Sequence, residues 1–267
     1  MSWRDEIESV FGAPVAGATQ VQGGDLSDLL RVTLQTGRVL AVKRGPYVGT
    51  EARMLRAMAL AGAAVPDVLH NGGRLLCLEW LDETAPAGAE AWAALGTGLR
   101  RMHNSRSADY GWPEDYAFGA VAIENAMLPD WPGFWAERRL APCLPALPAD
   151  LARRVETVIA RLPDLLPAQV DGALLHGDLW TGNALFSGED AYMIDPACYH
   201  GHSEVDLAML ELFGQPPDSF WRAYGPLEQG RDARVPLYQL WPALVHVRLF
   251  GAGYHGMAAG LLDRLGA

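Results

Sequence analysis

The sequence of 267 residues has few cysteines, and they follow no recognisable pattern. Cys77, Cys143 and Cys198 lie far apart, without the Cys-x-x-Cys or Cys/His spacing of a zinc site. A disulfide framework requires paired cysteines in a short secreted chain. We therefore expect three isolated reduced thiols and no zinc or redox chemistry.

Long apolar runs are also missing. The first ten residues, MSWRDEIESV, contain acids where a secretory signal requires an apolar run. The longest apolar stretch near the end, residues 249–262, is too short to span a bilayer. These features predict a soluble cytoplasmic protein with no membrane partner.

Positive charge is scarce, because 21 Lys and Arg residues stand against 32 Asp and Glu residues and give a net charge of −11. Such a surface repels polyanions, and no local basic patch offsets it. We expect no nucleic-acid partner. Half of the residues are hydrophobic and 20% are charged, so the chain can bury a large core in one compact unit or in two packed lobes.

The first 82 residues show short extended segments separated by turn residues. Residues 18–22, 28–35 and 38–44 are typical of three antiparallel strands. A helix is expected over residues 50–60, which are rich in strong helix formers. Strand-like residues 68–70 and 75–81 flank the turn Asn71-Gly72-Gly73. The sequence thus predicts a five-stranded antiparallel sheet with one helix.

The rest of the chain is mainly helical. Segments with helical patterns are separated by Pro and Gly, and two short strand-like pieces at 184–186 and 192–194 interrupt them. A Trp-rich stretch, 110–148, is a candidate for shaping the acceptor pocket, although nothing in it identifies a ligand. Helices are expected over residues 89–103, 151–162, 205–213, 218–224 and 236–259. The fold class predicted is α+β with two lobes, residues 1–82 and 83–267.

The strongest functional signal is HGDLWTGN, residues 176–183, with Ile194-Asp195-Pro196 beginning eleven residues after its last position. This pattern resembles the catalytic segment of kinases, in which one Asp activates the acceptor hydroxyl, and an Asn and a second Asp hold magnesium. The spacing predicts Asp178 as the base and Asn183 and Asp195 as ligands of Mg²⁺, which prefers hard oxygen atoms. His176 is expected to brace the loop. The alternative is a pair of ordinary polar turns.

Upstream residues supply the expected nucleotide site. The run Val39-Leu40-Ala41-Val42-Lys43 resembles the kinase VAIK strand, so Lys43 is predicted to reach the ATP phosphates and to pair with Glu51. Alone, each of these two residues is more often a solvated surface residue. Two further parts are expected from their position. Gly23 and Gly24 lie in the turn that would cover the phosphates, although the full GxGxxG pattern is missing. Glu79 and Leu81 lie in the hinge, where their main chain would meet adenine. The expected cofactors are ATP and Mg²⁺.

Over nearly its whole length the chain resembles the fructosamine kinase (ketosamine-3-kinase) family, which shares its fold with aminoglycoside and choline kinases. The resemblance is carried by HGDLWTGN, by IDPACYHGHSEVDLAM at 194–209 and by segments 226–227, 237–240 and 246–254. A tryptophan after Asp-Leu is unusual among kinases of this fold. The resemblance implies transfer of the γ-phosphoryl group of ATP to the 3-hydroxyl of a ketoamine sugar, such as a fructosamine or a ribulosamine.

Two residues are candidate acceptor contacts. Trp180 lies two positions after the base, where its ring face can stack on a sugar or hold a protonated amine by a cation–π contact worth about 0.5–2 kcal/mol; the alternative is a core aromatic. Glu204 can attract a cationic amine, although it can equally be structural. Asp206 is expected to brace the catalytic loop. Some family members carry a redox-active cysteine where Asp25 stands, so that switch is expected to be absent.

The identity of the acceptor stays open at this stage. The same fold phosphorylates aminoglycosides, choline-like alcohols and other small hydroxyl compounds, and fold alone does not choose among them. A nucleotide-binding regulator without catalysis is a further alternative, which the presence of all the motif residues disfavours. Free glycated amino acids, ribulosamines and glycated proteins all remain possible acceptors, and the oligomeric state is open.

Overall fold

A five-stranded antiparallel sheet occupies one end of the molecule in the computed structural model, which describes residues 2–21, 28–83 and 86–267. Its strand order is β1-β2-β3-β5-β4. The five strands lie close to the predicted segments, and they are β1 (Val15–Gln20), β2 (Asp28–Leu34), β3 (Val39–Arg44), β4 (Val68–Gly72) and β5 (Leu75–Glu79). The predicted antiparallel sheet is confirmed.

A helix that the sequence analysis did not predict, α1 (Trp3–Phe11), precedes the sheet. Its first turn is closed by a capping box, in which Asp5 N–H donates to Ser2 Oγ at 3.2 Å and Ser2 N–H donates to Asp5 Oδ2 at 2.9 Å. It ends at Gly12, which has a left-handed φ of 64°. The Ser-x-x-Asp start and the Gly end are both helix signals visible in the sequence.

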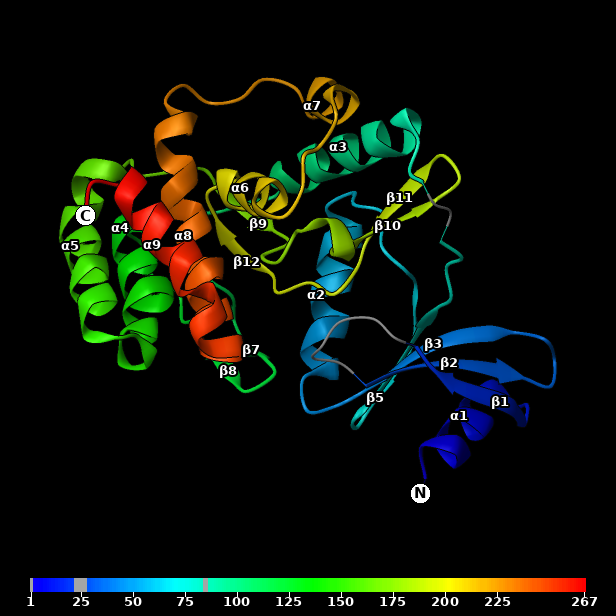
Figure 1. Cartoon of the computed structure of the whole chain (residues 1–267). Coiled ribbons are helices and arrows are strands. Elements are labelled where there is room, and N and C mark those ends of the chain that lie inside the picture. Colours follow the sequence, from blue (N-terminus) through cyan, green and yellow to red (C-terminus); the bar gives the residue numbers. More distant parts are fainter. Residues whose placement is uncertain (1, 22–27, 84–85) are drawn as a thin grey trace.

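The predicted helix after the third strand, α2 (Val48–Leu60), has two apolar faces. Leu55 packs with Leu76 and Leu78 of the sheet. Met54 and Met58, both fully buried, instead join a cluster of side chains from the later part of the chain. The helix therefore links the sheet to the rest of the molecule, as its central place in Figure 1 shows.

Residues after 85 form the mainly helical part. Its α-helices are α3 (Ala89–His103), α4 (Trp131–Phe134), α5 (Ala149–Leu165), α6 (Glu204–Leu212), α7 (Asp218–Tyr224), α8 (Arg231–Phe250) and α9 (His255–Arg264). A π-helix and three 3₁₀ turns connect some of them, namely η1 (Trp135–Leu140), η2 (Ala141–Ala146), η3 (Thr181–Asn183) and η4 (Gly251–Tyr254). The single helix predicted over 236–259 is wrong, because Gly251 adopts a φ of 75° and separates α8 from α9.

Short strands lie in the segments that connect these helices. The three-stranded sheet β12-β9-β6 consists of β12 (Tyr199–Gly201), β9 (Gly172–Leu175) and β6 (Arg106–Ser107). The two predicted pieces near 184 and 192 form the hairpin of β10 (Ala184–Ser187) and β11 (Asp190–Met193). A second hairpin, β7 (Tyr116–Phe118) and β8 (Val121–Ile123), lies in the Trp-rich stretch and was not predicted.

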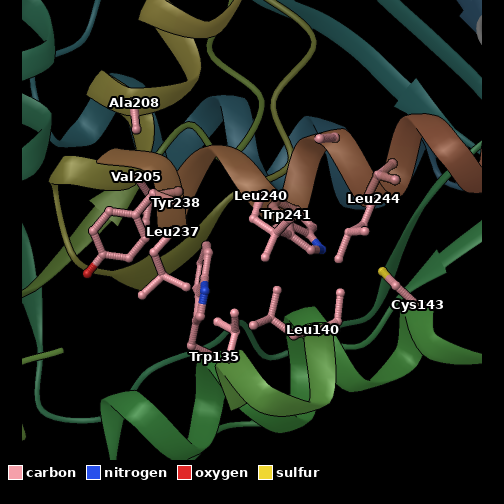
Figure 2. Close-up of a cluster of buried hydrophobic side chains, with 14 of the residues drawn as sticks. Trp135, Leu140, Cys143, Val205, Ala208, Leu237, Tyr238, Leu240, Trp241 and Leu244 are labelled. Atoms are coloured by element: carbon pink, nitrogen blue, oxygen red, sulfur yellow. The ribbon is translucent and has the colours of Figure 1, made fainter. Parts of the chain in front are cut away.

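Helix α8 is the centre of the helical core. Figure 2 shows its apolar side chains facing η1 and η2, with Trp241 close to Trp135 and Leu140. Full burial of each large apolar side chain contributes roughly 1.5–3 kcal/mol. This packing fixes the position of α8, whose later residues Val245 and His246 line the cavity described below.

The sheet and α1 lie at one end of the molecule, and α5, α8 and α9 lie at the other (Figure 1). The lobe boundary at residue 82 stays a prediction. One hydrophobic cluster crosses it, since Met54 and Met58 pack with Leu95 and Leu99 of α3. Among the described helices, none has the length and apolar character needed to cross a membrane.

Candidate active site

A cavity of about 590 Å³ brings together residues that are far apart in the sequence. Lys43 and Glu51 come from β3 and α2, and Asp178, Asn183 and Asp195 come from the loops around β9, β10 and β11. The structure thus assembles these five predicted residues around one space. Such a volume is typical of small-molecule sites.

Lys43 is buried, with 5% of its surface exposed, and it is the only lysine in the sequence. Its Nζ donates to Glu51 Oε1 at 2.6 Å and also bonds to Asp195. Burial disfavours the charged ammonium, but the carboxylates of Glu51 and Asp195 outweigh it and raise the pKa of Lys43 above its ordinary value. The side chain is therefore a fixed cation in the lining of the cavity.

Asp178 and Asn183 form the second polar pair. The Asn183 Nδ2 amide donates to the carbonyl oxygen of Asp178 at 2.8 Å and to its Oδ2 at 3.0 Å. Burial raises the pKa of the Asp178 carboxyl well above its usual value; the bond from Asn183 opposes this shift, and the negative charges of Asp195 and Asp206 add to it. Because a raised pKa strengthens a carboxylate as a proton acceptor, Asp178 suits the role of a base.

The backbone of the catalytic loop is held by Asp206 at the start of α6. Its two carboxylate oxygens accept the N–H groups of His176, at 2.7 Å, and of Gly177, at 2.9 Å. His103 Nε2 donates to the same carboxylate at 3.1 Å. The expected brace is confirmed, and it fixes the residues directly before Asp178.

His176 joins the catalytic loop to the Asp195 loop. Its Nδ1 accepts the N–H of Asp178 at 3.2 Å, and its Nε2 donates to the carbonyl of Ile194 at 2.9 Å. Burial lowers the pKa of His176, which keeps the ring neutral and able to accept at one nitrogen and donate at the other. This arrangement supports the expected bracing role rather than a role in proton transfer.

Backbone conformation matters at two positions next to these bonds. Gly177 has a φ of 80°, and a Cβ there would lie 2.1 Å from the carbonyl oxygen of Ala197. Asp195 has a φ of 56°, the left-handed region that non-glycine residues seldom adopt. Unusual backbone at such a place is typical of functional sites.

Beyond Asp178 the cavity is lined mainly by aromatic and aliphatic side chains. Trp180, predicted from its position, lies on this wall with 37% of its surface exposed. The sequence analysis assigned no individual role to the other aromatic residues here, which are Tyr116, Phe118, Phe213, Tyr238, Trp241, His246, Phe250 and Tyr254. Segment 246–254 was noted only as part of the family pattern, which was the one signal that pointed to it.

Several predicted site residues lie elsewhere. Glu204 is buried outside the cavity and accepts two bonds from Arg234, at 2.7 and 2.6 Å, so its predicted contact with the acceptor is corrected to an internal ion pair. Glu79 and Leu81 do not line this cavity. Gly23 and Gly24 lie outside the described residues.

Comparison with known proteins agrees with the kinase-like site. The fructosamine kinase family profile matches residues 2–267. The chain is 38% identical to a probable ketoamine kinase of Synechocystis, over 80% of this chain and 77% of the relative, and 30% identical to the chloroplastic protein-ribulosamine 3-kinase of Arabidopsis thaliana, over 97% and 82%. A crystal structure of a candidate fructosamine-3-kinase from Thermobifida fusca superposes with a TM-score of 0.88 at 35% identity, covering 99% of this chain and 98% of that one.

The fold and the polar groups of the cavity define a phosphotransferase of the protein-kinase-like class, with a buried Lys–Glu pair facing an Asp–Asn loop. Within this class, the chain belongs to the fructosamine kinase family, whose members act on ketoamines.

Proposed function

We propose that this protein transfers the γ-phosphoryl group of ATP to the 3-hydroxyl of a ketoamine sugar, a fructosamine or a ribulosamine. The observation that carries the proposal is the single cavity shared by the Lys43–Glu51 pair and the Asp178–Asn183 pair. The acceptor follows from the relatives, one of which is named a protein-ribulosamine 3-kinase.

The fold supports the binding of a nucleotide. An aminoglycoside phosphotransferase with a TM-score of 0.64 and 14% identity was solved with AMP-PNP and hygromycin B. In the proposal, Lys43 holds phosphate oxygens, and the predicted contacts of Gly23, Gly24, Glu79 and Leu81 complete the nucleotide site. The main chain of the last two would meet the adenine edge.

The charge of the cavity fits a divalent cation. Among the described residues that line the cavity, Glu51, Asp178 and Asp195 supply three carboxyl groups, and Lys43 supplies the one ammonium. Asn183 uses its Nδ2 on Asp178, which leaves its amide oxygen for a metal, and Asp195 has a second carboxylate oxygen besides the one bonded to Lys43. These hard oxygen atoms are the ligands that Mg²⁺ prefers. When bound, Mg²⁺ neutralises charge on the β- and γ-phosphates.

The chemical step needs little covalent help from the protein. Asp178 accepts the proton of the sugar hydroxyl as the sugar oxygen forms its bond to the γ-phosphorus, and the bond from that phosphorus to the β-phosphate oxygen breaks. Asn183 orients the Asp178 carboxylate, and Asp206 holds the loop below it. Catalysis then comes mainly from positioning and from charge stabilisation.

The test is the replacement Asp178→Asn, which keeps the size of the side chain and removes the base. Turnover should fall by roughly a hundredfold or more, the range that general bases contribute. The assay follows magnesium-dependent ATP consumption with ribuloselysine, fructoselysine, kanamycin and choline, and mass spectrometry identifies the product.

Asp190→Asn, on the exposed end of the β10–β11 hairpin, is the matched control and should retain full activity. Unchanged turnover in Asp178→Asn would refute the assignment of the base. Faster phosphorylation of kanamycin or choline than of either ketoamine would refute the acceptor.

A further inference from the structure

Five aromatic rings form a continuous wall on one side of the cavity. They are Trp180, Phe213, His246, Phe250 and Tyr254, and we call them the aromatic wall. Ring centroids lie 6.5 Å apart between Trp180 and Phe213, 5.1 Å apart between Phe213 and His246, and 4.8 Å apart between His246 and Tyr254. Phe250 contacts both His246 and Tyr254.

The aromatic wall begins beside the base and ends at solvent. Trp180 follows Asp178 by two residues, whereas Phe250 stands at the end of α8 with 45% of its surface exposed. Both are among the few large hydrophobic side chains with such exposure in the described part of the chain. Exposed aromatic residues that line one cavity are typical of a binding surface rather than of a core.

The aromatic wall carries no charge. Burial lowers the pKa of His246, although the bond that its Nδ1 donates to the Pro242 carbonyl at 2.8 Å opposes the shift. Lys43 is the only Lys or Arg among the described residues that line the cavity, and two carboxylates already hold it. Residues 22–27 contain no Lys, Arg or His in the sequence.

This distribution of charge favours one type of acceptor. The amine nitrogen of a ketoamine is protonated near neutral pH, and the face of an aromatic ring can hold such a cation. A carboxylate next to that nitrogen would meet the uncharged aromatic wall and no free Lys or Arg among the described residues of the lining, and desolvating it unpaired is costly. An apolar group in its place would meet the faces and edges of aromatic rings.

We propose that the aromatic wall binds the amine-derived part of the ketoamine, and that the enzyme selects ketoamines of apolar, above all aromatic, primary amines over those of free α-amino acids. This inference rests on the proposed function and adds the class of amine that the sugar carries. Trp180 and Phe213 lie nearest the sugar, and Phe250 and Tyr254 contact the far end of the amine part.

The test uses ketoamines of three amines, methylamine, phenethylamine and phenylalanine, and each amine is tested with a ribulosyl head and with a fructosyl head. The value of kcat/KM for phosphorylation should be roughly tenfold or more higher for phenethylamine than for methylamine, since the ring gains aromatic contacts. It should be lower by a similar factor for phenylalanine, which differs from phenethylamine by one carboxylate.

Variants Phe250→Ala and Tyr254→Ala should lower the phenethylamine value more than the methylamine value, so that the two values come close together. Leu60→Ala, which truncates a side chain that is 91% exposed on α2, is the control and should change none of the three. Thermal melts of all variants confirm folding.

The outcomes separate the inference from the proposed function. Equal kcat/KM for the three amines, or equal losses for methylamine and phenethylamine in the Phe250 and Tyr254 variants, would overturn the role of the aromatic wall and leave ketoamine phosphorylation intact. Phosphorylation of ribuloselysine or fructoselysine without phosphorylation of any of the three would also overturn the inference, whereas no phosphorylation of any ketoamine by the wild-type enzyme would refute the proposed function itself.

Discussion

Lys43 shows how a single side chain can report on the site. A protonated ammonium does not react with acylating reagents, so the raised pKa and the burial of Lys43 both slow its modification. Because the sequence contains no other lysine, the α-amino group is the only competing amine. Acylation at Nζ can therefore be followed by the mass of one peptide.

We predict that Glu51→Gln makes Lys43 react faster at pH 9. Removing the Glu51 carboxylate lowers the pKa of the ammonium and increases the fraction of neutral amine, by about tenfold for each pKa unit. The measurement is the rate of acylation by peptide mass spectrometry, with the α-amino group as internal reference. Equal rates in the two proteins would show that Glu51 does not set the protonation of Lys43.

The spacing of residues in the sequence was sufficient to identify cavity residues that belong to a known motif. Lys43, Glu51, Asp178, Asn183 and Asp195 were all identified before the structure, and all line one cavity. The error at Glu204 has a physical cause, since its partner Arg234 lies 30 residues later on another helix, and no local pattern links the two. An ion pair between charged residues far apart in the sequence depends on how their helices pack.

At the scale of elements, the β7–β8 hairpin is held against α2 by an ion pair. Glu114, just before β7, accepts bonds from Thr50 Oγ1 at 3.0 Å and from Arg53 Nε at 2.5 Å. Tyr116 and Phe118 of the same hairpin line the cavity. The pair therefore positions part of the cavity lining.

We predict that Arg53→Ala raises the KM for the acceptor several-fold and changes kcat less, because the hairpin loses an anchor but the catalytic loop does not. The free energy of unfolding should change by only about 0.2–1 kcal/mol, the usual value for an exposed ion pair. Steady-state kinetics and urea unfolding measure the two effects. Arg222→Ala, which removes an exposed pair with Asp218, is the control; an equal rise in its KM would contradict the prediction.

Some elements were predicted closely and others were missed. The bounds of α3 and α7 agree with the predicted segments. The β7–β8 hairpin was missed because each strand has three residues, too few to show a period of two. The helix predicted over 236–259 continued through Gly251, where apolar residues on both sides hide the break that its left-handed φ makes.

At the scale of the whole molecule, the three cysteines occupy three different hydrophobic clusters. Cys77 lies in the cluster of the sheet and α1, Cys143 in the cluster around α8, and Cys198 in the cluster that α2 shares with α3. All three are buried. Burial raises the pKa of each thiol, to about 12 for Cys77, where the nearby Glu6 adds to the shift. Since the thiolate is the reactive form, none should react in the folded protein.

We predict that the three thiols become reactive at one urea concentration, because the cluster of Met54 and Met58 joins the sheet to the helical part and couples their unfolding. Alkylation with iodoacetamide at increasing urea, followed by peptide mass spectrometry, gives a midpoint for each cysteine. Met54→Ala, at a cost of about 2–5 kcal/mol, should weaken this coupling and move the Cys77 midpoint below the Cys143 midpoint. Separate midpoints already in the wild type would instead make the boundary near residue 82 a boundary between independently unfolding units.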